Sequence, residues 1–479
     1  MAKTAKRTAT KGKSKKTATA GTSAKTAEKK AATKAKTSKA TVPITTSPKV
    51  FFLTYGCTFN FADSDALKAE AAKKYEIAKT QDDAGIIVMN TCSVKDSTQE
   101  KILFKAKALA AQEKKLVITG CLAQVTPELI EKAVPSASIL GVWSNAKIIE
   151  AIESALAGKK IVQTKKTTAL PFNVTVDGIF ARVQINRGCL GNCTYCSTKL
   201  ARGRLESFPQ EQIVSAVEAA IAMGAKEIQL TSQDTACYGF DFEGNKKEGE
   251  KTAAGNKNLA TLVGKISQIP GRFRVRIGMG NPEHFWKIRK DLAKAICSTG
   301  KVYRFLHIPV QSGSDSVLAA MNRGYTAKEY AKLSKFFHKE IPDLTIETDI
   351  IVGFPTETDG DFEATLELIE KTRPQITNIS KYSARPKTPA ARMKQLERKT
   401  VNARSTKMNA LCRKIALEEN RKMVGKTYGV LVTERQKGGK ARTMNYKTVV
   451  LESAAVGSFI TAQTTGYGQC HLKGKIVKG

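Results

Sequence analysis

Short apolar runs alternate with longer segments of helical spacing from residue 50 onward. The first apolar runs span residues 50–53, 85–89 and 116–119, and helical spacing occupies residues 63–78 and 96–113 between them. Asp63 and Ser64 are candidate caps of the first helix. Because strands that alternate with helices form parallel sheets, we expect a doubly wound parallel α/β sheet over residues 49–157.

The alternation resumes after residues 158–178, whose irregular mixture of Lys, Thr and Pro predicts a linker. Strand-like runs follow at residues 179–185, 227–231, 273–277, 304–308 and 345–351, with a helical segment at 209–223. A basic helix is expected at residues 391–420. These repeated strand–helix units predict a second α/β domain, which we place at residues 179–420.

The two ends of the chain have patterns of their own. Residues 421–479 contain β-like runs at 427–433 and 448–451 separated by Gly-rich turns, which predicts a small all-β barrel. Residues 1–48 are mostly Lys, Ala and Thr. Because this segment has few large apolar side chains with which to form a core, we expect it to be disordered.

Positive charge changes the picture of the partners. The formal net charge is +36; the first 49 residues hold 14 Lys/Arg and one Glu, and residues 421–479 hold 11 Lys/Arg and two Glu. Such an excess favours polyanionic partners, RNA above all. Surplus Lys that serves only solubility or the host's ionic conditions is the alternative. For the tail, salt-sensitive RNA affinity and a solvated segment without a specific role both stay open.

Hydropathy and cysteine content indicate the compartment. No apolar run approaches the roughly 18 residues of a membrane span, and the N-terminus lacks an apolar signal-peptide core. We therefore expect a cytoplasmic protein without a membrane segment. In a chain that is not secreted, its ten cysteines indicate metal ligands rather than disulfides.

Three cysteines form a C-x3-C-x2-C run at Cys189, Cys193 and Cys196. Three thiolates on a four-iron cluster leave one iron free to bind a small molecule, which indicates chemistry at the cluster rather than electron transfer alone. The alternative is a zinc site, since thiolates also suit Zn²⁺. A structural zinc site needs a fourth ligand, and the next His after Cys196 is His284.

A second set of cysteines follows predicted strands. Cys57, Cys92 and Cys121 each come just after a strand of the N-terminal sheet. Because the carboxyl ends of parallel strands lie along one edge, these three thiols are expected to converge on one site. The alternative is that each is a small buried apolar residue.

The run around Cys189 resembles the signature of the radical S-adenosylmethionine (SAM) enzymes. That signature is C-x3-C-x-aromatic-C, and Tyr195 fills its aromatic position. The resemblance implies a [4Fe–4S] cluster whose open iron binds SAM, and cleavage of SAM to a 5′-deoxyadenosyl radical. It also implies a partial (β/α) barrel for residues 179–420.

Further motifs resemble the methylthiotransferase branch of these enzymes. They are residues 54–57 with Asn60 and residues 63–65, then residues 90–94, then residues 119–121. In that branch the N-terminal domain holds a second [4Fe–4S] cluster, so the resemblance implies that Cys57, Cys92 and Cys121 are its ligands. Residues 382–390 resemble the segment after the barrel, although Ala384 and Lys387 stand where Pro and Gly are usual.

The same resemblance implies further SAM-binding residues at the ends of the barrel strands. The candidates, besides Tyr195, are Gln233, Asp234, Arg276, Gln311, Gly353 and Glu357.

The C-terminal segment resembles the TRAM RNA-binding domain, and residues 442–447 resemble the archaeal and eukaryal branch. The implied activity is conversion of N6-threonylcarbamoyladenosine, next to the tRNA anticodon at position 37, to its 2-methylthio derivative. Two SAM molecules per turnover, tRNA, an electron donor and a sulfur donor are implied.

Two other functions stay open. A sister branch methylthiolates an aspartate of a ribosomal protein, but the basic C-terminal domain would repel such a basic partner. A non-catalytic iron–sulfur RNA-binding protein that senses redox state is the second, and SAM turnover would exclude it.

Overall fold

A computed structural model describes residues 48–93, 96–167, 172–243, 256–435 and 439–477 of the 479-residue chain. The predicted disorder of residues 1–48 therefore falls almost wholly outside the described residues. Within the described part, no helix combines the length and the apolar content needed to cross a membrane.

The N-terminal domain contains one parallel sheet whose strands follow chain order. They are β1 (Val50–Thr54), β2 (Ile86–Thr91), β3 (Lys115–Gly120), β4 (Ser138–Leu140) and β5 (Val162–Gln163). The predicted parallel α/β sheet is confirmed. Because all four pairings are parallel, neighbouring strands end side by side along one edge.

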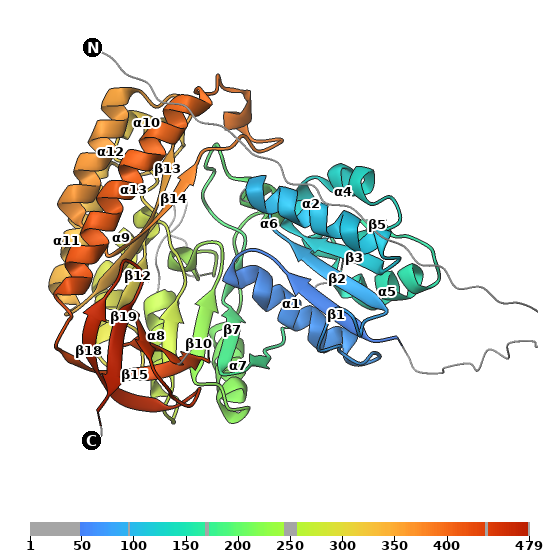
Figure 1. The fold of residues 1–479 in the computed structure, drawn as a ribbon, viewed down its shortest axis with the longest axis horizontal. Coiled ribbons are helices and arrows are strands. Elements are labelled where there is room, and N and C mark those ends of the chain that lie inside the picture. The colour runs from blue at the N-terminus through green and yellow to red at the C-terminus, as the bar shows by residue number, and fades with distance from the viewer. Residues whose placement is uncertain (1–47, 94–95, 168–171, 244–255, 436–438, 478–479) are drawn as a thin grey trace, which may run out of the picture. The chain divides into compact units, whose positions relative to one another are not determined.

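Helices cover both faces of this sheet (Figure 1). Helices α1 (Thr58–Ala71) and α5 (Ile148–Leu156) pack on the face that contains Ile86 and Val88. Helices α2 (Asp96–Ala111) and α4 (Pro127–Ala133) pack on the face that contains Ile87 and Met89. Alternate residues of a strand point to opposite faces, so the wholly buried β2, with its apolar run at residues 86–89, serves both layers.

Helix α1 departs from its predicted bounds. It begins at Thr58 rather than at residue 63 and ends at Ala71. Asp63 and Ser64 are therefore not caps; they lie inside the helix, where both are buried. Ser64 Oγ accepts hydrogen bonds from Thr54 and Asn90. Asp and Ser residues can cap a helix or make contacts between elements, and the sequence pattern does not distinguish these two roles.

The central domain is a partial barrel of parallel strands. Its strands are β7 (Phe180–Gln184), β10 (Glu227–Thr231) and β11 (Arg274–Ile277) in one sheet, and β12 (Phe305–His307), β13 (Thr345–Val352) and β14 (Ile376–Lys381) in another. A parallel bridge from Val275 to Val302, just before β12, links the two sheets. This confirms the expected partial barrel.

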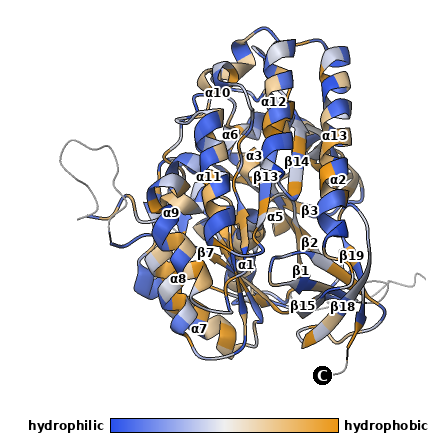
Figure 2. Cartoon of the chain, turned by 90° about the vertical axis from the view of Figure 1, so that its left-hand side faces the viewer, coloured by the Kyte–Doolittle hydropathy of each residue, from blue (hydrophilic) through white to orange (hydrophobic). Residues whose placement is uncertain are grey.

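Helices surround the barrel strands. They include α7 (Gln210–Ala222), α8 (Leu259–Gln268), α9 (Pro282–Cys297), α11 (Ala327–Glu340), α12 (Asp359–Thr372) and the long α13 (Arg398–Arg421). Hydrophilic and hydrophobic stretches alternate around α12 and α13 in Figure 2. Their apolar faces therefore join the core beneath, which contains Leu366, Ile369, Met408 and Ile415.

The segment after β14 explains one departure from the family pattern. Lys387 has a φ of 67°, the left-handed conformation for which glycine is usual. Its Nζ donates to the Val125 carbonyl at 2.6 Å and lies 3.4 Å from Glu128 Oε1. The lysine thus keeps the turn and adds a contact with the N-terminal domain.

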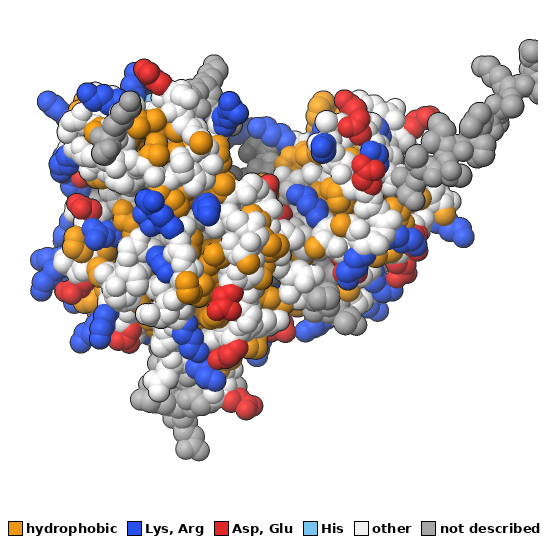
Figure 3. Space-filling model, turned by 90° about the horizontal axis from the view of Figure 1, so that it is seen from below, with side chains coloured by type: hydrophobic (Ala, Val, Ile, Leu, Met, Phe, Trp, Pro, Cys, Tyr) orange, Lys and Arg blue, Asp and Glu red, His pale blue; other side chains and the backbone are white. Residues whose placement is uncertain are grey.

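The last domain is a closed five-stranded β-barrel, as predicted. Its strands, in barrel order, are β15 (Thr427–Glu434), β16 (Gly439–Thr443), β17 (Thr448–Leu451), β19 (Leu472–Ile476) and β18 (Phe459–Tyr467). Figure 3 views the protein from below Figure 1; Lys and Arg side chains are spread over that face rather than gathered in one patch.

The turn between β16 and β17 packs into the central domain. The Tyr446 ring centroid lies 4.8 Å from that of Tyr303 and 4.6 Å from that of Phe305, where β12 begins. Arg304 N donates to the Met444 carbonyl at 2.8 Å. Lys447 is buried beside them and donates to the Gln375 carbonyl at 3.3 Å. Burial lowers the pKa of Lys447 to about 8.

Candidate functional site

Cys57, Cys92 and Cys121 come together at the edge where β1, β2 and β3 end. Cys57 precedes α1, Cys92 follows β2, and Cys121 begins the short helix α3 (Cys121–Val125). A Cβ on Gly56 would lie 3.2 Å from Cys92 Sγ, and Gly56 has a φ of 110°. Only glycine allows this close approach.

The thiols of this first triad influence the ionisation of Cys121. Burial raises the pKa of the Cys121 thiol to about 11; the Arg202 guanidinium opposes this rise, and the Cys57 and Cys92 thiols add to it. Cys121 Sγ also lies 3.7 Å from Asn60 Oδ1. The raised pKa does not prevent metal binding, because a metal displaces the proton of a thiol that it binds.

Cys189, Cys193 and Cys196 surround a tight loop between β8 (Asn186–Arg187) and helix α6 (Ser197–Arg202). A Cβ on Gly191 would lie 3.5 Å from Cys189 Sγ and 3.7 Å from Cys193 Sγ. Burial, with help from the Asp234 charge, raises the pKa of Cys189 to about 12. Burial also raises the pKa of Cys196.

An arginine from a distant element supports this second triad. Arg323 Nη1 donates to Cys193 Sγ at 3.3 Å, and Arg323 Nη2 donates to the Pro309 carbonyl at 3.1 Å. Arg323 follows helix α10 (Asp315–Ala320), 130 residues after Cys193. A guanidinium beside a thiol stabilises the thiolate form that a metal requires.

The two triads are neighbours. Ser93 follows Cys92, Ser197 follows Cys196, and the two serine hydroxyls lie 3.2 Å apart. Ala201 of α6 packs in one cluster with Cys121. The loops that present six thiols are therefore in direct contact.

One buried ion pair joins these loops. Arg202 Nη1 lies 2.6 Å from Asp63 Oδ2, and the two side chains are only 5% and 9% exposed. Arg202 Nη2 donates to Asn60 Oδ1 at 2.9 Å, and Gln184 Nε2 donates to Asp63 Oδ1 at 2.7 Å. Asp63 had been noted as part of a motif, but sequence reasoning missed Arg202 as its partner.

Gln233 and Asp234 lie against the cysteine loop. Gln233 Oε1 accepts from the Gly188 backbone N at 2.7 Å. Asp234 Oδ2 lies 2.6 Å from His284 Nδ1, and Asp234 Oδ1 accepts from the Asn281 backbone N at 3.0 Å. Burial opposes ionisation of Asp234, but His284 and these donors outweigh it and hold its pKa below the ordinary value.

The other candidate SAM contacts are held by protein neighbours. Tyr195 packs edge-on against Phe354, with ring centroids 6.4 Å apart. Gln311 has a φ of 72° and its backbone N donates to the Asp349 carbonyl at 2.8 Å. Arg276 lies over the rings of Phe305 and Tyr446.

Glu357 and Gly353 form a separate anchor. Glu357 Oε2 accepts from the Gly353 backbone N at 2.8 Å and from Arg404 Nη1 at 2.7 Å. Arg404 belongs to α13, so this buried carboxylate fixes α13 to the end of β13. Although Arg404 opposes it, burial raises the pKa of Glu357.

Comparison with protein families divides the chain into two matched regions. The model of the Radical SAM superfamily matches residues 183–369, and that of the uncharacterized protein family UPF0004 matches residues 49–141. These regions contain the second and the first cysteine triad, respectively.

Similar curated proteins share one description. A "probable threonylcarbamoyladenosine tRNA methylthiotransferase" of Pyrococcus horikoshii is 39% identical over 90% of this chain and 99% of that protein. The Archaeoglobus fulgidus protein of that name is 41% identical over 86% of this chain and 95% of its own. The Homo sapiens threonylcarbamoyladenosine tRNA methylthiotransferase is 32% identical over 90% of this chain and 74% of its own.

A solved structure supports the fold. The radical SAM methyltransferase TsrM from Kitasatospora setae, with cobalamin and a [4Fe–4S] cluster bound, superposes with a TM-score of 0.52. The match covers 72% of this chain and 77% of that one at 13% identity, so it concerns the fold alone.

Proposed function

The chain belongs to the threonylcarbamoyladenosine tRNA methylthiotransferase family, and from this premise we propose that it methylthiolates N6-threonylcarbamoyladenosine at tRNA position 37. The observation that carries the proposal is the contact between two loops that each present three thiols. A reaction that needs a radical and a sulfur at one carbon requires two such centres side by side.

Each triad suits an iron–sulfur cluster with one open iron. Membership of the radical SAM superfamily implies one [4Fe–4S] cluster and SAM, and Cys189, Cys193 and Cys196 would hold that cluster. A second [4Fe–4S] cluster on Cys57, Cys92 and Cys121 is part of our proposal. When bound, these groups supply reductive cleavage of SAM and the sulfur for insertion, and a second SAM supplies the methyl group.

The protein's own residues would prepare both sites. Arg323 beside Cys193 and Arg202 beside Cys121 place a positive charge where each thiolate must form. Gln233 holds the cysteine loop through Gly188 N. Asp234, kept ionised by His284, is suited to the SAM amino group. Gln311 and Gly353 lie at the ends of barrel strands, where the nucleoside part would lie.

Two of the candidate SAM residues are assigned other roles in this proposal. The Arg276 guanidinium is stacked between rings of the central and C-terminal domains. The Glu357 carboxylate is already satisfied by Arg404 and Gly353 N. We assign Arg276 to domain packing and Glu357 to anchoring α13. Neither side chain would then touch SAM; each would act on it only by positioning the strand ends around it.

The charge of the chain suits tRNA. The C-terminal segment 421–479 has a net charge of +9 from 11 Lys/Arg and two Glu, which favours phosphate contacts and disfavours a basic ribosomal protein. The target adenosine would have to leave the anticodon stack to reach the triads, as bases do in other base-modifying enzymes.

The test is an anaerobic reconstitution of the full chain. We expect about eight irons per chain, 5′-deoxyadenosine formation, and a methylthio gain on threonylcarbamoyladenosine by mass spectrometry of tRNA. A protein that binds iron and RNA but never cleaves SAM would be a redox-sensing binder, and the proposal would fail. Methylthiolation of a ribosomal aspartate without tRNA modification would assign the chain to the sister activity.

A further inference from the structure

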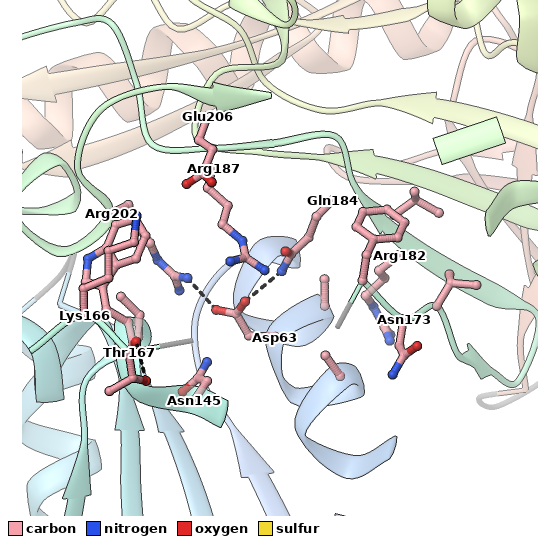
Figure 4. Close-up of a pocket in the computed structure, with 17 residues that line it drawn as sticks. Asp63, Asn145, Lys166, Thr167, Asn173, Arg182, Gln184, Arg187, Arg202 and Glu206 are labelled. Atoms are coloured by element: carbon pink, nitrogen blue, oxygen red, sulfur yellow. Dashed lines mark hydrogen bonds and ion pairs between the residues drawn. The ribbon is translucent and has the colours of Figure 1, made fainter. Parts of the chain in front are cut away.

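A polar pocket lies between helix α1, strand β7 and the segment around Trp143 (Figure 4). In the close-up, the side chains of Arg187, Arg202 and Gln184 point toward Asp63. The Arg202 and Gln184 contacts with Asp63 are the 2.6 Å and 2.7 Å interactions described above. Trp143, Phe172 and Val174 contribute apolar surface to the same pocket.

The arginines of this pocket differ in how their charge is balanced. Arg182 pairs with Asp65 at 2.9 Å and with Asp177 at 3.0 Å, and Arg202 pairs with Asp63. The Arg187 side chain, by contrast, makes no hydrogen bond or ion pair with any residue that the structure describes, although the Asp63 and Glu206 carboxylates are near enough to attract its charge. Its guanidinium only stacks over the Phe208 ring, 5.1 Å from the centroid.

An unpaired guanidinium in a pocket is a site for an anion. Its N–H groups form a planar fork that matches the two oxygens of a carboxylate. Lys166, which lies 5.1 Å from the Trp143 ring centroid, adds a second positive charge to the lining. The carboxylates of the lining are Asp63, which is paired with Arg202, and Glu206. With four basic side chains beside these two carboxylates and an aromatic wall, the pocket suits a small anionic group on an organic substituent.

The pocket lies beside both cysteine triads. Arg202 in its wall contacts Cys121, and Arg187 precedes Cys189 by two residues. On adenine, C2 and the amino group at C6 flank the same ring nitrogen, N1. A residue that reads a substituent on the amino group must therefore lie close to whatever reacts at C2.

We propose that Arg187 binds the carboxylate of the threonylcarbamoyl group and so selects the modified adenosine as substrate. Threonine joined through its amino nitrogen leaves its carboxylate and hydroxyl free, and the carboxylate is the one anion that distinguishes this base from unmodified adenosine. The inference rests on the proposed function and adds the residue that would determine its specificity.

The test measures binding without turnover, using reconstituted full-length protein with SAM and no reductant. Three anticodon stem–loops of one sequence carry threonylcarbamoyladenosine, its carboxamide analogue or adenosine at position 37. We expect the wild type to prefer the carboxylate by about tenfold or more, the usual worth of a charged hydrogen bond. Arg187→Gln should remove this preference and leave affinity for the adenosine hairpin unchanged.

Two further variants make the test specific. Arg187→Lys keeps the charge but not the two-pronged geometry, so we expect a partial loss of preference. Arg204→Gln removes an exposed arginine outside the pocket. As the matched control it should weaken all three hairpins alike, because a generic charge contributes only to phosphate attraction.

Several results would overturn the inference. If Arg187→Gln weakens binding of all three hairpins by the same factor, Arg187 contacts phosphate rather than the carboxylate. A wild type that binds the carboxamide hairpin as tightly as the carboxylate hairpin would refute carboxylate recognition without any substitution, even if Arg187→Gln lost its clusters. Methylthiolation by the wild type is scored separately, so failure of this inference differs from failure of the proposed function.

Discussion

Replacing Asp63 by Asn tests the ion pair between α1 and α6. The change keeps the size of the side chain and an oxygen for Gln184, but it leaves the buried Arg202 guanidinium without its counter-charge. Breaking a buried pair by neutralising one partner costs about 3–5 kcal/mol. With a urea m-value of about 1–3 kcal/mol per molar, the unfolding midpoint should fall by about one molar or more.

Trp143 provides a local reporter for this experiment. The chain has two tryptophans, Trp143 and Trp286, and a Cβ on Gly203 would lie 3.2 Å from Trp143 Cζ2, directly beside Arg202. In a Trp286→Phe background, fluorescence therefore follows the junction rather than the whole chain. Because the chain has several cores, a local signal is preferable to a global unfolding transition.

An exposed ion pair provides the control. Lys160 Nζ lies 3.4 Å from Glu131 Oε1 and both side chains are more than 40% exposed, so Glu131→Gln should cost less than about 1 kcal/mol. Asp63→Asn combined with Arg202→Met should recover part of the loss, since no unpaired charge remains. If Asp63→Asn is as mild as Glu131→Gln, the buried pair does not stabilise the junction and the reasoning fails.

Four further outcomes follow from the contacts described. Cys121→Ser and Cys189→Ser should each lower iron from about eight to about four per chain, and loss of all iron in either variant would contradict separate sites. Burial lowers the pKa of Lys447 to about 8. Between pH 8 and 10.5 this lysine is protonated only in the unfolded chain, so the free energy of unfolding should rise by about 3 kcal/mol over that range. Lys447→Met should abolish this rise in denaturation measured across pH. Glu357→Gln should lower the melting temperature without SAM present, whereas a change seen only with SAM would restore a direct cofactor role. Deleting residues 1–47 should weaken tRNA binding at low salt and not at high salt if the tail contacts RNA, and equal affinities at both would discard that role.

The sequence was sufficient wherever periodicity and strand ends decide the structure. The runs before Cys57, Cys92 and Cys121 are unambiguous apolar strands, and parallel pairing then requires their ends to meet. The closed C-terminal barrel followed from β-like runs and Gly-rich turns in the same way. The start of α1 could not be predicted. Asp is a residue type that often caps helices, but Asp63 lies inside α1 and pairs with a residue of another element.

The contacts that support the site lie beyond local patterns. Arg202 and Arg323 each reach a cysteine, but neither spacing nor composition distinguishes them from the other basic residues of a chain with 79 Lys and Arg. The pairing of Arg323 with Cys193 crosses 130 residues and depends on barrel closure. The run of polar residues in α1, Asp63 to Asp65, between Phe59 and Leu67 was the one available signal for buried polar partners.

The Tyr446 side chain makes the C-terminal domain part of the architecture of its neighbour. Its ring fills space against Tyr303 and Phe305, and the Met444 carbonyl in the same turn accepts a hydrogen bond from the backbone N of Arg304, which precedes β12. The domain therefore cannot be exchanged freely: replacing it by another small β-barrel would leave a hole beneath β12 unless the incoming turn carried an aromatic residue of similar size. Sequence changes in the small barrel should therefore be best tolerated on the surfaces that face away from that turn.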